Sequence, residues 1–561
     1  MKGRARLTSA TPRQTADAFV DAYIDLDPIA ATVYGLRPGE ERLPDFSPDG
    51  AQAVAELIRR TLTELDTAAQ DDPAERRCGR LLKERLTADL AVHEAGEGLR
   101  AVSSLRSPVQ SIRQALGLMP TGTEADWEAR ARRMGRVPAA LHGYVASLAE
   151  GLKQQLPGGP MQVAAAIDQL DALLGGPAGT SWFEDLAASG PDSLRSELEA
   201  GARSATEAVA DLREWLRTVY GPGVEGAPET VGRERYLSWA RYWTGADLDP
   251  DEAYAYGWSE VHRIQAEMRE AAELVLPGST ALEAMHHLEE HGEAVEGTEG
   301  IRAWLQSLTD TAIDTLNGTY FELAEQITRT ETLIAPPGCG SVPFYTQPSI
   351  DFSRPGRTWL PVEPGRTSFP VWNLVSTWYH EGVPGHHLQY AQWMVMADRL
   401  STYQATLGAV SANVEGWALY AERLMDEFGH LTDPARRLGY LNGQMLRAVR
   451  LVVDIGMHLE LGIPAGAGFH PGERWTPGLG REFLGACTGL PATALDSEHT
   501  RYLGLPGQAI GYKLGERVWL EGRRAAQGVH GGSFDLKRWH MAALSQGPLG
   551  LDDLAAELSM L

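Results

Sequence analysis

Ala16-Asp-Ala-Phe-Val-Asp-Ala-Tyr-Ile24 is the stretch that decides the fold class. Its apolar residues recur three and four positions apart, which gathers them on one face of a helix with about 3.6 residues per turn. The same spacing recurs at Ala281-Leu-Glu-Ala-Met-His-His-Leu288. Runs of β-branched residues with period two are scarce, so the sequence predicts a mainly helical, all-α fold.

The best strand candidates are Gly340-Ser-Val-Pro-Phe-Tyr345 and Thr358-Trp-Leu-Pro-Val362. They predict at most a small β-hairpin beside the motif described below. Breaks rich in Pro and Gly separate the helices, but none is long enough to be a flexible linker. We therefore expect one helical unit over residues 1–561, with a helical N-terminal lobe over 1–330 and a motif-bearing C-terminal lobe over 331–561.

The chain has 561 residues and a formal net charge of −25 at pH 7. The acidic residues are spread along the chain and no basic face is offered to phosphates, so we expect no nucleic-acid partner. The same charge repels anionic membranes, and no stretch approaches the roughly 18 apolar residues that a membrane helix needs. These features argue against a membrane partner; the partner that we expect, from the motif described below, is a small-molecule or peptide substrate.

The three cysteines, Cys78, Cys339 and Cys487, stand far apart without C-x-x-C spacing. Neither a disulfide framework nor a thiolate metal site is indicated, and a reducing compartment fits this pattern. The N-terminus begins with positive residues, but Leu7-Thr-Ser-Ala-Thr-Pro-Arg-Gln-Thr15 lacks the apolar core of a signal peptide. We expect a cytoplasmic protein.

His380-Glu381-Gly-Val-Pro-Gly-His386-His387 carries the groups of a catalytic zinc site. Such a site uses three protein ligands and one open position, where a bound water can be activated. Glu381, next to the first His, would be the general base that takes a proton from this water. The cluster therefore predicts metal-assisted hydrolysis.

The spacing of these histidines differs from the usual i, i+4 pair. In an unbroken helix His386 would lie about 120° round from His380, and His387 about 10 Å along the axis, so neither pair would fit one tetrahedral metal. Pro384-Gly385 predicts a kink or bulge that changes this geometry. If two residues are looped out, His386 becomes the second ligand; if three, His387 does. We favour His386, and His387 is then the alternative ligand or an acid and base beside the site.

A third ligand is expected from Glu415-Gly-Trp-Ala-Leu-Tyr-Ala-Glu422, which predicts a second helix. Glu415 and Glu422 lie seven residues apart, on nearly the same face but about 10 Å from one another. Only one of the two can reach the metal. The other would be a partner of a ligand or a solvated charge.

These motifs resemble the DUF885 family of bacterial proteins, a functionally ill-defined relative of the helical HExxH-type zinc carboxypeptidases and oligopeptidases. The resemblance rests on the motif from His380 to Gln389 and extends over most of the chain. Its other blocks are Leu26–Gly35, Tyr345, Ser353–Gly356, Glu415–Glu422, Arg450–His458 and Pro506–Gly515. It implies a large, two-lobed, metallopeptidase-like helical architecture with a deep cleft.

The resemblance also implies roles for single residues. Glu415 would be the third metal ligand, as in gluzincins, and Tyr512 would hydrogen-bond the developing oxyanion as a preorganised donor. Many members of the family are exported lipoproteins, whereas this chain has no lipobox-like Cys and no export signal.

Three further groups complete the candidates. Tyr345 and Arg354, upstream of the motif, could bind a substrate carboxylate, because a guanidinium offers two parallel donors. Asp454 and His458 could orient a metal-bound His or form a buried structural pair. His287-Leu-Glu-Glu-His291 matches an inverted zinc motif, but its strongly polar flanks indicate a solvated helix face.

The sequence thus favours a zinc-dependent hydrolase of peptide or other amide bonds, with one Zn²⁺ held by His380, His386 and Glu415. Two His and one Glu would also accept iron, manganese or cobalt. Two alternatives remain. One is a metalloenzyme that acts on a small metabolite, and the other is a non-catalytic binding protein that keeps the helical cleft.

Overall fold

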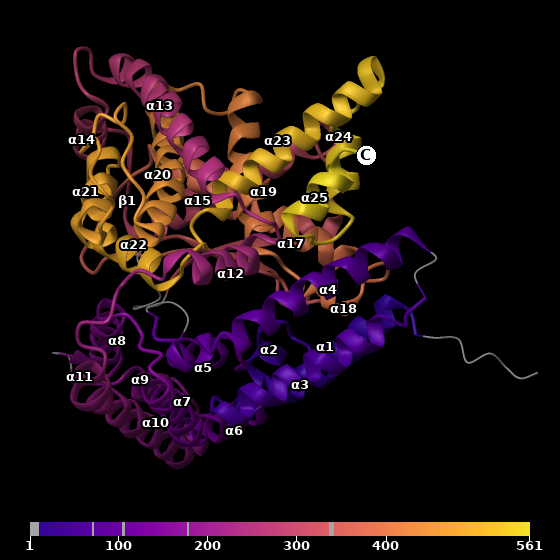
Figure 1. The fold of residues 1–561 in the computed structure, drawn as a ribbon, viewed down its shortest axis with the longest axis vertical. Coiled ribbons are helices and arrows are strands. Elements are labelled where there is room, and N and C mark those ends of the chain that lie inside the picture. The colour runs from indigo at the N-terminus through magenta and orange to yellow at the C-terminus, as the bar shows by residue number, and fades with distance from the viewer. Residues whose placement is uncertain (1–9, 70–71, 104–106, 177–178, 336–341) are drawn as a thin grey trace, which may run out of the picture. The chain divides into compact units, whose positions relative to one another are not determined.

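The computed structural model describes residues 10–69, 72–103, 107–176, 179–335 and 342–561, and helices dominate it (Figure 1). The strands among these residues are short, with three to five residues each. The all-α prediction is confirmed. By its internal contacts the chain divides into two compact units, which are residues 1–227 with 396–409 and residues 228–395 with 410–561.

Unit 1 is built from helices alone in the part of it that is described. They are α1 (Pro12–Leu26), α2 (Pro28–Val33), α3 (Pro48–Leu65), α4 (Pro73–Glu94), α5 (Pro108–Leu118), α6 (Glu124–Met134), α7 (Val137–Lys153), α8 (Pro160–Leu173), α9 (Trp182–Ala188), α10 (Arg195–Trp215), α11 (Gly221–Gly223) and α18 (Thr402–Ala405), with short 3₁₀ turns at Glu97–Arg100 and Asp192–Leu194 and a π turn at Leu216–Tyr220.

Several helices of unit 1 begin with a proline that directly follows an N-cap residue. Thr11, Ser47 and Ser107 each accept a hydrogen bond from a backbone N–H of the first turn, and a proline follows each of them as the first helical residue. A proline is well placed there because its missing N–H would have had no helical partner. These sequence signals fix where the helices start.

The core of unit 1 forms around α10. Its buried residues recur three and four positions apart, so one face of the helix packs on α6, α7 and α9. The residues of this face are Leu198, Ala202, Ala205, Val209 and Leu212.

Segment 396–409 lies far along the chain from the rest of unit 1 but joins it through specific contacts. The Arg399 carbonyl oxygen accepts a hydrogen bond of 2.9 Å from the Arg13 guanidinium, and Ser401 Oγ lies 3.4 Å from Cys78 Sγ. Cys78 and Cys487 are free thiols, and Cys339 lies outside the described residues.

Unit 2 holds the motif. Its helices are α12 (Gly232–Thr244), α13 (Pro250–Val275), α14 (Ala281–His291), α15 (Thr298–Leu316), α16 (Leu374–Glu381), α17 (His386–Val395), α19 (Ser411–Glu427), α20 (Pro434–Leu459), α21 (Pro477–Cys487), α22 (Ala492–Gly504), α23 (Gly511–His530), α24 (Leu536–Leu544) and α25 (Leu551–Leu558), with 3₁₀ turns at Glu325–Thr328 and Gly531–Ser533.

The boundary between the units falls at residue 227, whereas the sequence suggested lobes that meet near residue 330. Residues 228–330 belong with the motif-bearing unit because α13 packs along α20. In addition, Tyr254 of α13 donates a hydrogen bond of 3.1 Å to the Gly462 carbonyl and accepts one of 2.7 Å from Trp475 Nε1. The sequence of an amphipathic helix shows which of its faces is apolar, but not which element packs against that face.

Five strands form two small sheets in unit 2. β4 (Gly356–Leu360) pairs parallel with β2 (Thr330–Ile334) and antiparallel with β3 (Phe344–Thr346), and β1 (Ala294–Glu296) pairs antiparallel with β5 (Ser368–Pro370). The β3–β4 pair is the small hairpin-like element expected beside the motif. The β2 strand and the β1–β5 pair were not predicted.

Helices α19 and α23 cross at two glycines, and this crossing positions the site. A Cβ atom on Gly416 would collide with the backbone of Gly515, and one on Gly515 with the Ala412 carbonyl oxygen. The two backbones therefore touch, as only glycine permits at such a close approach. Glu415 directly precedes one glycine and Tyr512 lies three residues before the other, so the crossing brings both to one cavity.

No helix in the described part of the chain is long and apolar enough to cross a membrane.

Candidate metal centre

The motif is split between two helices. α16 ends at Glu381 and α17 begins at His386, with Gly382–Gly385 looped out between them. The Gly385 N–H donates to the Tyr379 carbonyl and the His387 N–H to the Gly382 carbonyl, which fixes the loop. A Cβ on Gly385 would collide with the His380 carbonyl oxygen, so the turn needs glycine here. The break lies where Pro384-Gly385 predicted it.

The break brings the two imidazoles together. The rings of His380 and His386 lie 4.7 Å apart between centroids, at 82° to one another. Ligand atoms of His380, Glu381 and His386 all lie within 4.8 Å of each other, and all three residues are buried. The displaced spacing in the sequence therefore still gives converging donors.

Glu415 of α19 completes the cluster. Its Oε2 lies 3.3 Å from His380 Nε2 and 3.5 Å from His386 Nε2. Two ligands that each lie about 2.1 Å from a tetrahedral metal are about 3.4 Å apart. The distances from Glu415 Oε2 to the two imidazole nitrogens thus match the distance between neighbouring ligands in such a coordination shell.

Two buried atoms of this cluster lack a hydrogen bond within the described residues. They are Glu415 Oε2, which faces the two imidazoles, and His386 Nδ1. An unsatisfied buried carboxylate oxygen is costly unless a cation or a donor meets it. Burial opposes the charge of Glu415, but the two imidazoles outweigh it and hold the pKa of this carboxyl well below its usual range.

Glu422 lies about two helical turns beyond Glu415 on α19. It contacts the ring nitrogen of His380 that faces away from Glu415. His380 Nδ1 lies 2.8 Å from Glu422 Oε1, and Ser376 Oγ donates a hydrogen bond of 2.5 Å to the other carboxylate oxygen. This contact directs His380 Nε2 toward Glu415, as a carboxylate behind a metal-binding His commonly does. Burial lowers the pKa of His380, but the neighbouring carboxylates of Glu415 and Glu422 outweigh it and raise that pKa to about 9.

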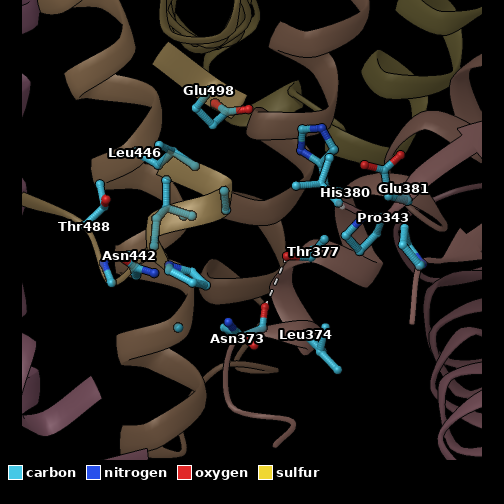
Figure 2. Close-up of a pocket in the computed structure, with 18 of the residues that line it drawn as sticks. Pro343, Asn373, Leu374, Thr377, His380, Glu381, Asn442, Leu446, Thr488 and Glu498 are labelled. Carbon is cyan, nitrogen blue, oxygen red and sulfur yellow. Dashed lines mark hydrogen bonds between the residues drawn. The ribbon is translucent and has the colours of Figure 1, made fainter. Parts of the chain in front are cut away.

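Glu381 lies beside these groups with a buried side chain (Figure 2). Burial raises the pKa of its carboxyl above the usual range, against the opposing effect of the two imidazoles. A carboxylate whose pKa is raised toward neutrality is suited to accept and release a proton in catalysis.

His387 is placed away from the cluster. Its Nε2 donates a hydrogen bond of 2.7 Å to the Ile327 carbonyl, and its Nδ1 accepts one of 2.9 Å from the Tyr345 hydroxyl. The ring is fully buried, and burial lowers its pKa to about 4. With both nitrogens engaged in the chain itself, the geometry favours His386 over His387 as the ligand. It gives His387 a positioning contact in place of the acid and base role that the sequence suggested.

The remaining sequence candidates are divided. Tyr512 lines the cavity, with its ring stacked 6.4 Å from that of His380. Tyr345 also lines it, but its hydroxyl is bonded to His387. Arg354 is not among the described residues that line the cavity, so the structure does not bring it to the cluster.

Asp454 and His458 have other partners. Asp454 accepts hydrogen bonds from the Tyr236 hydroxyl (2.7 Å) and the Gly507 N–H (2.9 Å), and His458 Nε2 donates to the Tyr502 carbonyl. They form a buried structural group, and Glu422 has the orienting position considered for them. The polar helix face at 287–291 is solvated, as its flanks indicated: the His291 side chain is 62 % exposed.

The cluster opens into a cavity of about 940 Å³ within unit 2. Figure 2 shows part of its lining, with Glu498 toward one end, Asn373 and Leu374 toward the other, and His380 and Glu381 to one side. Sequence reasoning missed three arginines in this lining, which are Arg447, Arg450 and Arg501. The i, i+3 spacing of the first two was the available signal, since it places both on one helix face.

Comparisons with known proteins give a family and a fold. The profile of the family described as "Bacterial protein of unknown function (DUF885)" matches residues 28–558. No curated protein matches the chain. Two solved structures are similar: the "putative lipoprotein" from Colwellia psychrerythraea (22 % identity, TM-score 0.83, covering 98 % of this chain and 99 % of that one) and a "putative lipoprotein of unknown function" from Shewanella oneidensis (16 % identity, TM-score 0.73, covering 98 % and 100 %).

Proposed function

We propose that this chain, which belongs to the DUF885 family of bacterial proteins of unknown function, is a zinc-dependent hydrolase of peptide or other amide bonds. The observation that carries the proposal is the position of Glu415 Oε2, buried and without a hydrogen bond in the described residues, 3.3 and 3.5 Å from two imidazole Nε2 atoms. A cation between these three atoms would satisfy all of them.

The donor set fits zinc. Two imidazole nitrogens and one carboxylate oxygen leave a fourth position open, which is the arrangement of catalytic rather than structural zinc. The same donors would take iron, manganese or cobalt, so the choice of zinc rests on its common use in hydrolysis. When bound, the metal would lower the pKa of a coordinated water to about 7 and polarise a carbonyl oxygen.

The residues around the site have distinct tasks in this hydrolysis. Glu381 accepts a proton from the attacking water and passes it to the leaving amine, while the water oxygen bonds to the carbonyl carbon and the C–N bond breaks. Tyr512, from the N-terminal turn of α23, offers a hydroxyl donor to the oxygen on which negative charge develops. Glu422 keeps His380 oriented throughout.

The same roles are those of the helical HExxH zinc peptidases. We propose that the chain is a relative of these enzymes in which Gly382–Gly385 opens the motif helix between its two histidines. The imidazole pair, the adjacent Glu381 and a glutamate from a second helix would then correspond in function to the parts of the HExxH site.

The Glu381→Gln substitution tests the proposal. It removes the base and keeps the size of the side chain, so we expect about 10²–10⁴-fold slower hydrolysis of a mixed peptide library with unchanged zinc content. Glu427→Gln, on the exposed end of α19, is the matched control and should leave turnover intact. If Glu381→Gln hydrolyses the library as fast as wild type, or if wild type with bound zinc hydrolyses nothing in it, the hydrolase proposal fails.

A further inference from the structure

One face of α20 forms a wall of the cavity. Its lining residues recur three and four positions apart, so they project from the same side of the helix. They are Gly439, Asn442, Gly443, Leu446, Arg447 and Arg450. The two arginines lie at one end of this row, and Arg501 of α22 joins them in the lining.

These arginine side chains are buried or largely buried, in a chain with a net charge of −25. The side chains of Arg447, Arg450 and Arg501 are 12, 8 and 13 % exposed. A buried positive charge needs an anion nearby, because burial without one is costly. The anions already present therefore decide whether a ligand is needed.

Glu498 is the anionic partner of two of the arginines. It accepts hydrogen bonds from Arg450 Nε (3.0 Å) and Nη2 (2.7 Å) and from Arg501 Nη2 (2.9 Å). Two positive charges thus share one negative charge, and Arg447 adds a third positive charge to this wall of the cavity.

Arg447 is held more loosely. Its Nη1 donates a hydrogen bond of 3.2 Å to the Gly443 carbonyl, its Nη2 lies 3.7 Å from Glu422, and its Nε is buried without a hydrogen bond in the described residues. Glu422 itself is already bonded to His380 and Ser376. Arg447 therefore has donor capacity left for a ligand.

The distance from these arginines to the metal cluster is short. The centroid of the Tyr512 ring lies 6.4 Å from that of the His380 ring. The guanidinium carbons of Arg450 and Arg447 lie 4.7 and 5.9 Å from the Tyr512 ring centroid. The guanidinium of Arg450 is thus no more than about 11 Å from the His380 ring, whereas an extended chain advances about 3.3–3.6 Å per residue. An anion bound there lies at most about three residues beyond the bond that is cleaved.

We propose that Arg447 and Arg450 bind the free α-carboxylate of a peptide, so that the enzyme removes about one to three residues from a C-terminus. This inference rests on the proposed hydrolase function. A planar guanidinium matches a carboxylate with two parallel hydrogen bonds, and the free α-carboxylate is the anion that a peptide carries at its C-terminus. A peptide bond deep within a long chain has no α-carboxylate at this distance.

Binding to the zinc-loaded Glu381→Gln protein tests the inference without turnover. The probes are an N-acetylated tripeptide with a free C-terminal carboxylate and the same tripeptide as its C-terminal amide, each titrated by calorimetry. We expect the free acid to bind at least about 10-fold more tightly, as charge-assisted hydrogen bonds allow. Adding Arg447→Met should abolish the preference, whereas adding Arg481→Met, at an exposed arginine of α21, should keep it.

Further measurements distinguish a failure of this inference from a failure of the hydrolase proposal. Should the Arg447→Met protein melt far below its parent, Arg447→Lys replaces it, keeping the charge but losing the paired donors, and the preference should fall at least about 3-fold. Equal binding of acid and amide, or tighter binding of an amidated peptide whose sole carboxylate is an Asp side chain, overturns the inference. If wild type cleaves acid and amide peptides equally well, the hydrolase proposal stands and this inference falls. If it cleaves neither, the hydrolase proposal itself falls.

Discussion

His380 Nδ1 lies 2.8 Å from Glu422 Oε1, and both side chains are almost completely buried. A hydrogen bond at this nitrogen fixes which ring nitrogen is left for a metal, and it keeps the ring from rotating. The site is therefore organised by a carboxylate that would not itself touch the metal.

We expect Glu422→Gln to weaken zinc binding by about 10–100-fold, because the amide cannot hold the imidazole as a carboxylate does. Competition with a chromogenic chelator measures this affinity. Arg523 binds the exposed carboxylate of Glu427 on the same helix, and Glu427→Gln should bind zinc like wild type. Equal zinc affinity in the Glu422 and Glu427 variants would mean that Glu422 does not support the site.

Gly385→Ala should damage both the fold and the site. The new Cβ collides with the His380 carbonyl oxygen, so the loop must shift, at a cost of about 2–4 kcal/mol in the free energy of unfolding. Urea unfolding measures the cost, and zinc content reports the site. Gly466→Ala is the control, because a Cβ there meets nothing within 4 Å. A Gly385 variant as stable as the Gly466 variant would show that the loop is not tightly packed.

Zinc affinity should rise with pH between 7 and 8. In the metal-free protein the pKa of His380 is raised to about 9, so this ring is protonated at pH 7 and must release its proton before it can bind a metal. One proton released per ion makes the affinity rise about 10-fold for each pH unit below that pKa. Titration of zinc at pH 7.0, 7.5 and 8.0 in a non-chelating buffer tests this, and affinity that stays constant over the range contradicts it.

Tyr345→Phe should lower stability but not zinc content. The change removes the hydrogen bond to the buried Nδ1 of His387, at an expected cost of about 1–3 kcal/mol. Thermal unfolding and metal analysis measure the two quantities. Tyr320→Phe is the comparison, since the Tyr320 ring stacks on Phe428 and its hydroxyl has no hydrogen bond within the described residues. Loss of zinc in the Tyr345 variant would point to His387 as a ligand after all.

Several parts of the site followed from local sequence. The spacing of apolar residues predicted helices, and Pro384-Gly385 predicted the break that brings His386 near His380. These features depend on short-range sterics and on glycine at one crowded position. His380, Glu381 and His386 could therefore be proposed before their geometry was known, whereas the choice of Glu415 over Glu422 came from the family resemblance.

Other parts depend on contacts that no local pattern encodes. The His387 ring is turned from the cluster by Ile327 and Tyr345, which precede it by 60 and 42 residues. The hydrogen bond from Arg450 to Glu498 requires α22 to lie beside α20. Short strands such as β2 and β5 are stabilised by their pairing partners rather than by their own residues.

The central claim is that His380, His386 and Glu415 hold one zinc ion. The most direct test is metal content by mass spectrometry, on protein purified without a His-rich tag or added metal, for wild type, His380→Ala and Glu415→Ala, with Glu427→Ala as a control on the same helix. We expect about one equivalent of zinc in wild type and in the control, and none in the two site variants. Absence of metal from wild type even after dialysis against zinc, or zinc retained in both site variants, would contradict the account.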